Sequence, residues 1–237
     1  PKAGDAGEIM LEQGPRGSKR IRGSFGKDYG NFKQLLMVNG TDEEGYRDDS
    51  GVDQQKVSWL YNYTTKNGAT LDGGFTMINL NQETAGYVTG TNSYADSALR
   101  ATNPNPEAYR DSVNGRVWTT ITQQVNDWEV VLTPYFREVN MNFMQHFLPG
   151  QPIEDTEQRS LGLQLAAYRT LDNGAEFAMG LDLEDTSGSL KQTQPNPTTG
   201  SFFLRNSIPQ GKHYDYDVDI QQVAGFVNYE QDLGSGW

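Results

Sequence analysis

The sequence predicts an all-β fold, an antiparallel up-and-down transmembrane β-barrel segment of about ten strands that is open at both edges. Three observations support this prediction. Apolar and polar residues alternate along many segments, short and long connections alternate between those segments, and the composition is polar on average yet rich in aromatic residues. Because successive side chains of a strand point to opposite faces, such alternation gives one apolar and one polar face.

The composition fits a barrel wall and excludes several other classes of protein. Apolar residues make up 35% of the 237 residues, and the mean hydropathy is -0.70. No stretch reaches the roughly 18 apolar residues that a membrane-spanning helix needs, whereas a barrel strand needs only every second residue to be apolar. The net charge of -12 argues against a nucleic-acid partner, because nucleic acids are bound through Lys and Arg.

Two weaker observations concern the cellular compartment of the protein. Cysteine is absent, which excludes disulfides and Cys-type zinc sites and suits an oxidising compartment such as the periplasm. Residues 1–7 contain no apolar stretch of the kind found in signal peptides. An exported protein carries such a segment, so we expect the gene product to begin upstream of Pro1.

Ten strands are expected from the alternation. They lie, in order, at 7–14, 18–27, 31–42, 54–66, 69–82, 114–125, 128–143, 157–171, 175–188 and 219–232. Several exceed the usual soluble strand of about 5–6 residues, and about 9–11 residues span a bilayer with tilt. The strand at 31–42 alternates poorly, because residues 35–38 are all apolar.

The alternating residues also predict which side chains share a face. Asn62, Gln164 and Asp182 are expected to point away from the lipid. The apolar members of four strands are expected to form one continuous outer band: Val57, Trp59, Leu161, Leu163, Leu165, Phe177, Met179, Leu181, Val223 and Val227.

The connections differ in length at the two ends of the predicted strands. Short turns rich in Asn, Asp and Gly, which tolerate positive φ angles, fall at 27–30, 66–68, 126–127, 172–174 and 234–236. Longer polar connections fall at 43–53, 83–113, 144–156 and 189–218, and only 14–18 is short at that end. Transmembrane barrels have short periplasmic turns and longer extracellular loops. The asymmetry therefore favours a barrel over a soluble all-β carbohydrate-binding protein.

Several segments resemble TonB-dependent outer-membrane receptors. The sequences YRDDSG at 46–51, QQKV at 54–57, LNQETAGY at 80–87 and NPNPEAYRD at 103–111 resemble the early barrel of that family. The opening GEIMLEQG at 7–14 resembles the first barrel strand after the plug domain. The resemblance runs over most of the chain and is closest to the iron-siderophore branch.

This resemblance implies a location, a transport function and partners. It implies a multi-pass β-barrel in the bacterial outer membrane, in contact with lipid and lipopolysaccharide. It also implies import of a ferric siderophore or similar scarce nutrient, driven by the TonB complex through a plug. Plugged transporters have about 22 strands, so residues 1–237 are expected to be part of the receptor barrel, without plug and C-terminal strands. A passive porin-like or adhesin barrel is the alternative.

Two of the long loops contain aromatic and arginine residues that suit an anionic ferric chelate. Aromatic rings stack on such a ligand and arginine donates charge-assisted hydrogen bonds. The other interpretation is an outer aromatic girdle, with the arginines on lipopolysaccharide phosphate. The candidate ligand-binding residues are Tyr87, Tyr94, Arg100, Tyr109 and Arg110 in the loop at 83–113, and Phe202, Phe203, Arg205, Tyr214 and Tyr216 in the loop at 189–218.

We expect no enzyme activity and no cofactor. Asp182 and Glu184 lie two apart on one strand, where a water-filled lumen hydrates both, so we interpret them as lumen wall rather than as a glycosidase pair. No Gly-rich phosphate loop, nucleophile elbow or Ser-His-Asp arrangement is present.

A metal site is not expected either. Asp215, Asp217 and Asp219 resemble the first half of a calcium loop, but Ile220 occupies the position of the required glycine. Loose binding of divalent ions near lipopolysaccharide is the alternative for these residues. The two histidines, His146 and His213, lie in different long loops with no Cys or second His nearby.

Overall fold

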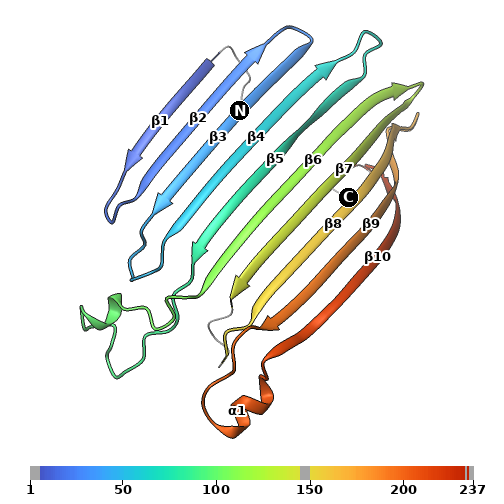
Figure 1. Ribbon diagram of the computed structural model, residues 1–237. Coiled ribbons are helices and arrows are strands. Elements are labelled where there is room, and N and C mark those ends of the chain that lie inside the picture. Colours follow the sequence, from blue (N-terminus) through green and yellow to red (C-terminus); the bar gives the residue numbers. More distant parts are fainter. Residues whose placement is uncertain (1–5, 145–149, 233, 235–237) are drawn as a thin grey trace.

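The computed structural model describes residues 6–144, 150–232 and 234, and it contains one antiparallel sheet of ten strands (Figure 1). Each strand pairs with the next in the chain, so the order across the sheet is β1 to β10. The strands are β1 (Ala6–Gln13), β2 (Lys19–Asp28), β3 (Phe32–Glu43), β4 (Val52–Thr64), β5 (Thr70–Glu83), β6 (Tyr109–Val125), β7 (Trp128–Met144), β8 (Ile153–Thr170), β9 (Glu176–Gln194) and β10 (Gly211–Glu230). The predicted all-β, up-and-down architecture is confirmed.

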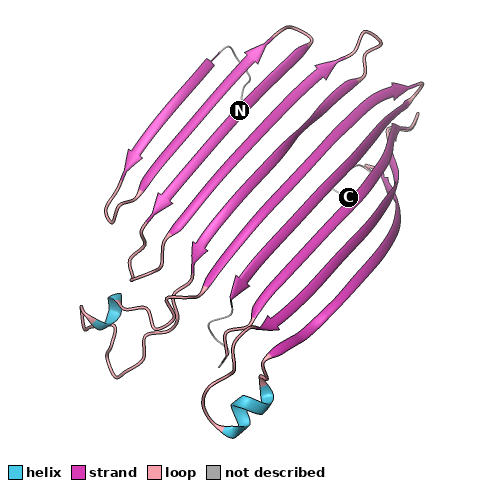
Figure 2. Cartoon of the chain, in the orientation of Figure 1, coloured by secondary structure: helices cyan, strands magenta, loops and turns pink. Residues whose placement is uncertain are grey.

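The sheet is curved and open at both edges. Among the described residues, β1 pairs only with β2 and β10 only with β9, so each leaves one edge unpaired. Helix is confined to two short pieces in the long connections, η1 (Leu99–Ala101) and α1 (Phe202–Ser207) (Figure 2). No helix in the described part of the chain is long and apolar enough to cross a membrane.

The predicted strand ends lie within two residues of the observed ones beside the short turns, whereas four ends beside the long connections, including the start of β8 at Ile153 rather than 157, differ by four to eight residues. β6 begins at Tyr109 rather than 114, β9 ends at Gln194 rather than 188, and β10 begins at Gly211 rather than 219. Backbone pairing continues from Gly211 opposite Gln194 to Asp219 opposite Ser187. In β10 the residues at 214–220 also alternate, but their apolar members Tyr214, Tyr216 and Val218 point to the concave face, whereas Val223 and Val227 point to the convex face. This change of face accounts for the misplaced start of β10.

The short turns have the backbone geometry that their residues predict. Gly30, Gly68 and Gly174 have φ angles of 85°, 83° and 79°, and Asn126 has a φ of 53°. Positive φ at these positions matches the right-handed twist of the strands that each turn joins. The turn predicted at 234–236 lies largely outside the described residues.

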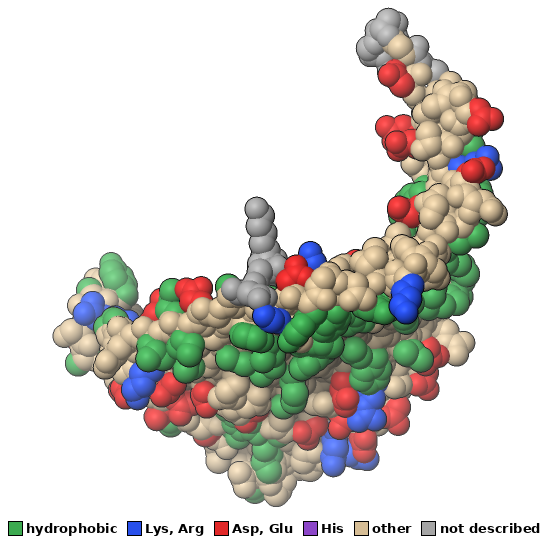
Figure 3. Space-filling view, turned by 90° about the horizontal axis from the view of Figure 1, so that it is seen from above, with side chains coloured by type: hydrophobic (Ala, Val, Ile, Leu, Met, Phe, Trp, Pro, Cys, Tyr) green, Lys and Arg blue, Asp and Glu red, His purple; other side chains and the backbone are tan. Residues whose placement is uncertain are grey.

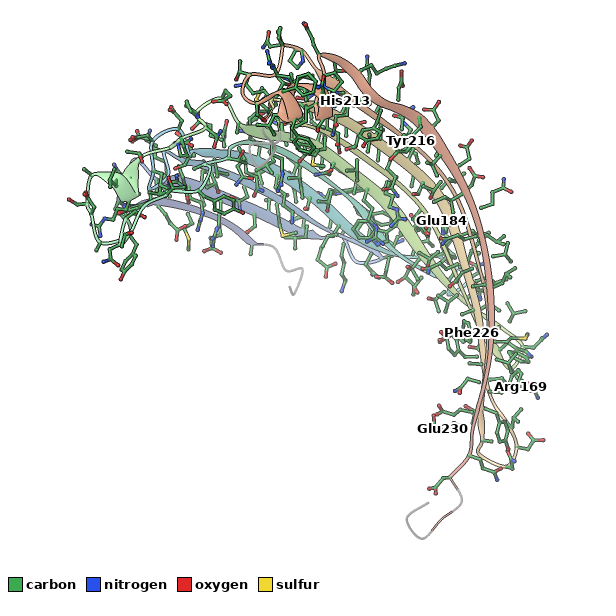
Figure 4. All side chains as sticks on the ribbon, turned by 90° about the horizontal axis from the view of Figure 1, so that it is seen from below. Arg169, Glu184, His213, Tyr216, Phe226 and Glu230 are labelled. Carbon is green, nitrogen blue, oxygen red and sulfur yellow. The ribbon has the colours of Figure 1, made fainter. Side chains whose placement is uncertain are left out.

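The strand register sorts the side chains into two faces, because directly paired residues point to the same side. Leu165 is paired with both Leu132 and Leu181, and Val57 with both Val38 and Met77. All ten side chains predicted for the outer band share this face, and Asn62, Gln164 and Asp182 take the other. Figure 3 shows hydrophobic side chains gathered along the convex side of the sheet, and Figure 4 places Phe226 on the concave side and Arg169 on the convex side.

The apolar part of the convex face is limited in height. Along β6 its apolar members Val117, Ile121 and Val125 extend over about 26 Å at roughly 3.3 Å per residue, which is about 20 Å in height for the roughly 40° tilt of typical barrel strands, whose apolar band is roughly 25 Å tall. Towards the long connections it gives way to polar residues, including Glu138 paired with Arg159. Towards the short turns it ends in aromatic rings, with Tyr29 and Phe32 at 6.2 Å between centroids.

The sheet has almost no buried apolar core. Ala69, Ala108 and Ala175 are the only hydrophobic residues, proline aside, that are buried in the described part of the chain. The Leu161 side chain on the convex face is 64% exposed. A soluble domain folds by removing such side chains from water, so this sheet requires an apolar surrounding that it does not itself provide.

The poor alternation of β3 has a structural explanation. Its convex members are Leu36 and Val38, whereas Leu35 and Met37 point to the concave face. Met37 lines a shallow concave hollow of about 350 Å³ together with Met10. The concave wall is therefore partly apolar at this edge.

Glycines allow aromatic side chains to lie across neighbouring strands on the concave face. Tyr135 on β7 is paired with Gly162 on β8, which is paired with Glu184 on β9. Since Gly162 has no side chain, the Tyr135 ring covers it and the hydroxyl donates a hydrogen bond to Glu184. Phe226 lies over Gly180 in the same way, and a Cβ atom there would be 2.2 Å from Phe226 Cε1.

Placing a charge on the convex face should impair assembly. Leu163→Arg or Leu181→Arg should lower the amount of protein that folds into lipid vesicles, because a charge that faces lipid near the midplane costs about 2–4 kcal/mol. Gln164→Arg is the matched control, since Gln164 is the neighbour of Leu163 on the concave face. Quantifying the folded protein in the vesicles checks this. Equal losses for Leu163→Arg and Gln164→Arg would show that the faces are misassigned.

A side chain at position 162 should displace the Tyr135 ring. A Cβ atom on Gly162 would lie 2.1 Å from Tyr135 Cζ, whereas Gly115 has no neighbouring atom within 4 Å of its Cβ position. Overpacking costs about 1–3 kcal/mol, so Gly162→Ala should lower the unfolding midpoint in detergent and Gly115→Ala should not. Combining Gly162→Ala with Tyr135→Ala should lose less than the two single changes together. Additive losses would exclude this contact.

Candidate functional site

The concave wall carries a hydrogen-bonded network centred on Glu184. Besides the Tyr135 hydroxyl, Arg137 Nη2 donates to its carboxylate at 2.7 Å and Thr186 Oγ1 donates at 2.8 Å. Thr186 is bonded in turn to the buried Ser160 hydroxyl at 2.7 Å. The hydrogen bonds of this network connect β7, β8 and β9. The charges of Arg137 and Glu184 neutralise each other, so the network offers no unpaired charge to a solute.

The connection between β5 and β6 is fixed to the connection between β3 and β4. The Arg47 guanidinium donates from Nε and Nη2 to the Thr102 carbonyl oxygen at 2.9 and 2.7 Å. Asp48 N–H donates to the Ala101 carbonyl oxygen at 2.8 Å, and Asn103 Nδ2 donates to the Asp49 carbonyl oxygen at 2.8 Å. The segment at 84–108 is therefore held against 44–51 at several points.

The connection between β9 and β10 is braced internally. Ser201 caps α1 by accepting from Leu204 N–H at 3.3 Å, Thr198 donates to the Ile208 carbonyl oxygen, and Gln210 donates to the Pro195 carbonyl oxygen at 2.9 Å. This holds α1 and its exposed aromatic side chains on a fixed support.

Gln151 joins the two loop regions. Its backbone N–H donates to Gln194 Oε1 at 2.9 Å, and its side-chain amide donates to Glu107 Oε1 at 2.8 Å. The end of β9 and the end of the 84–108 connection therefore meet through one residue.

Six of the ten predicted ligand-binding residues lie in the connections, as expected. Tyr87 and Tyr94 are in 84–108 and are 79% and 76% exposed, and Arg100 belongs to η1. Phe202, Phe203 and Arg205 all lie in α1 and are exposed. They occupy two groups, one on each loop, rather than a single cluster.

The other four lie on strands, which corrects their predicted location in loops. Tyr109 and Arg110 begin β6, and Tyr214 and Tyr216 lie near the start of β10, because backbone pairing extends beyond the apolar band. The side chains of Arg110, Tyr214 and Tyr216 share the concave face. Tyr109 points to the convex side, where its hydroxyl donates to Asn142.

His213 and the aspartates of β10 are not grouped as metal ligands in the described part of the chain. His213 bonds to Gln192 Oε1 at 3.2 Å and to the Pro209 carbonyl oxygen at 2.7 Å, and His146 lies outside the described residues. Asp215, Asp217 and Asp219 lie along one side of an extended strand rather than in a loop. The hydrogen bond from Lys212 at 2.9 Å lowers the pKa of Asp215, which lies beyond the apolar band. No group of metal-ligating side chains is found among the described residues.

Three loop residues that were not predicted as ligand-binding also lie at this end of the sheet: Arg16, Tyr46 and Arg47. Arg16 and Arg100 approach the ring of Tyr46, with Cζ at 4.8 and 6.0 Å from its centroid. Arg47 is the next residue in the chain. The signal that could have revealed Arg16 is its place in a two-residue turn, where Asn or Gly is usual.

Comparisons with known proteins identify the fold. No family model matches the sequence, and no curated protein matches it either. Among solved structures, the ferric citrate transporter FecA in its unliganded form has a TM-score of 0.74 and 12% identity, covering 96% of this chain and 35% of that one. The siderophore receptor PiuA from Acinetobacter baumannii has a TM-score of 0.67 and 11% identity, with 96% and 39% covered.

A third solved structure gives the same result. The ferripyoverdine receptor of the outer membrane of Pseudomonas aeruginosa has a TM-score of 0.72 and 10% identity, with 96% and 35% covered. None of the three is described as an enzyme. The chain spans between 35% and 39% of the length of these three proteins. At this identity the likeness is one of fold, and the fold is that of part of the barrel of TonB-dependent siderophore receptors.

Proposed function

We propose that this chain is part of the barrel of a TonB-dependent outer-membrane receptor that imports a ferric siderophore or a similar scarce nutrient. The observation that carries the proposal is the match of nearly the whole curved sheet to solved siderophore receptors. An apolar convex face and a polar concave face suit a wall between lipid and a water-filled lumen.

The exposed apolar side chains of the convex face support a location in the bacterial outer membrane. Because only three alanines form a buried hydrophobic core in the described residues, the convex side chains need lipid to cover them, and aromatic rings at the short-turn end suit the membrane interface. Strands contributed by the rest of the barrel would pair with the free edges of β1 and β10. The short turns would then face the periplasm and the long connections the cell exterior.

The proposed ligand is an anionic ferric chelate held above the concave wall. Arg110, Tyr214 and Tyr216 project from the strand extensions on the concave face, and the exposed residues of the two loops stand at the same end. Guanidinium groups bind carboxylate or catecholate oxygens, and tyrosine rings stack on flat ligands. Energy for import would enter through a plug outside residues 1–237, on which the TonB complex acts.

Substitutions on the concave face should weaken chelate binding. Loss of a charge-assisted hydrogen bond costs about 1.5–3 kcal/mol, so Arg110→Gln in the full-length receptor should lower affinity by about tenfold or more, and Tyr216→Leu should also weaken binding. Tyr109→Phe is the matched control, because Tyr109 is the adjacent residue and faces the other way. Binding of radiolabelled ferric chelate to whole cells, normalised to receptor abundance, is the measurement. Unchanged affinity in Arg110→Gln and Tyr216→Leu would remove these residues from the site.

Import should depend on TonB. Cells that express the full-length protein should accumulate ferric chelate only when the TonB complex is intact, because a plugged barrel does not pass solutes by diffusion. Binding at the cell surface should persist without TonB. Equal uptake in cells with and without TonB would replace this proposal with a passive barrel.

A further inference from the structure

One arginine lies on the convex face at the short-turn end of the sheet. Arg169 is the last convex residue of β8, and Figure 4 shows it on the convex side. Ala167, Leu165 and Leu163 continue from it along the same face into the apolar band. Because a charge next to lipid is costly, such residues pair with other groups and mark functional sites. The neighbours of Arg169 provide two kinds of contact, one aromatic and one charged.

Two aromatic rings flank Arg169 on the convex face. Its Cζ atom lies 5.9 Å from the centre of the Trp128 ring, and Phe177 is its direct partner on β9. The two rings contact each other edge to face, with centroids 5.9 Å apart and an interplanar angle of 81°. Arg169 Nε is buried and has no hydrogen-bond partner among the described residues. The arginine is therefore enclosed at the edge of the apolar band and does not extend freely into water.

An exposed carboxylate lies beside the guanidinium group. Arg169 Nη2 donates to Asp127 Oδ2 at 3.2 Å, and the Asp127 side chain is 72% exposed. Trp128 follows Asp127 in the chain, so one turn supplies both the anion and the ring. A cation and an anion therefore lie side by side at this end of the sheet, next to an indole group.

These three residues keep donors and acceptors for a ligand. Within the described part of the chain, one hydrogen bond uses a side-chain N–H of Arg169, none uses the Trp128 indole N–H, and Asp127 accepts only from Arg169. A guanidinium group has five N–H donors in one plane, and an indole N–H at a membrane interface finds its partner on the wet side. The remaining donors suit phosphate oxygens, and the other Asp127 oxygen suits an ammonium group.

The surrounding charges disfavour an anionic ligand. Asp172 lies in the next short turn, and Glu129 and Glu176 lie at the same end of the concave face. The short turn on the other side carries one cation, Lys66. Carboxylates outnumber cations here, which raises the free energy of binding a net negative group. A zwitterionic headgroup instead brings a phosphate for the cation and an ammonium group for the anion.

We infer that Arg169, Trp128 and Asp127 bind the headgroup of phosphatidylethanolamine, a zwitterionic phospholipid. Its phosphate accepts hydrogen bonds from the guanidinium and indole groups, and its acyl chains lie along Ala167 and Leu165. Its ammonium group donates to Asp127, which a choline headgroup cannot do because its nitrogen carries no hydrogen. The inference rests on the membrane location proposed above, and it goes beyond import because it involves neither chelate nor TonB.

Native mass spectrometry of the full-length protein in detergent, titrated with one phospholipid at a time, tests the site. The unaltered protein should bind phosphatidylethanolamine about tenfold more tightly than phosphatidylcholine or phosphatidylglycerol, as expected for one charge-assisted hydrogen bond. Arg169→Gln should reduce the affinity for phosphatidylethanolamine to that for the other two lipids. Asp127→Asn removes the anion, so it should raise the affinity for phosphatidylglycerol to at least that for phosphatidylethanolamine.

Lys33→Gln is the matched control, because Lys33 lies near the same end of the sheet but on the concave face, where it pairs with Asp28. It should leave all three affinities unchanged. Unfolding midpoints are measured for every variant. Asp127 is an exposed turn residue, so Asp127→Asn tests the site even if Arg169→Gln lowers the midpoint. Equal affinities of the unaltered protein for the three lipids would overturn the inference, and so would an unchanged preference in Asp127→Asn.

The site and the proposed function can fail separately. Uptake of ferric chelate without TonB, together with a retained preference for phosphatidylethanolamine, would overturn import and leave the site standing. Uptake that depends on TonB, together with equal affinities for the three phospholipids, would overturn only the site. Failure of the protein to fold into lipid vesicles would overturn the membrane location on which both depend.

Discussion

The structure depends on satisfying backbone hydrogen bonds without water. Within a bilayer an unpaired N–H or C=O group costs several kcal/mol, so a sheet can cross it only if every strand is paired. Here the ladders between neighbouring strands are nearly continuous, up to Glu230 on β10 opposite Glu176 on β9, with an interruption at Pro134, which has no N–H to donate. With only three buried alanines, Ala69, Ala108 and Ala175, among the hydrophobic residues of the described part, the ladders replace the core that holds a soluble domain together.

Once the register is fixed, the properties of both faces follow from it. A shift by one residue would exchange them, so rows such as Leu132, Leu165 and Leu181 depend on correct pairing. The same register brings Tyr135, Gly162 and Glu184 into one row, where the missing side chain of the glycine allows a bond that skips a strand. The strand register therefore determines both the apolar convex face and the hydrogen bonds of the concave face.

The sequence contained the fold but only part of the site. Alternation located all ten strands, because lipid imposes a strict period on the outward side chains, as at Leu161 to Leu165. It misplaced the start of β10 at Gly211, because the apolar residues at 214–220 alternate on the concave face, opposite to the face of Val223 and Val227. Arg16 and Tyr46 were missed for another reason. Their proximity is created by pairing of strands, and residues 30 positions apart carry no local pattern of it.

The pairing of consecutive strands affects how easily the connections can change. Each strand finds its partner immediately along the chain, so contacts remain local and the sheet can assemble hairpin by hairpin. Closing a loop costs free energy that rises only slowly with length, by about 0.6 kcal/mol for each doubling. By this relation the long connection at 84–108 costs only about 2 kcal/mol more to close than the tight turn at 126–127. Insertions in the long connections therefore cost little folding free energy, so these connections can lengthen without a change in the paired strands.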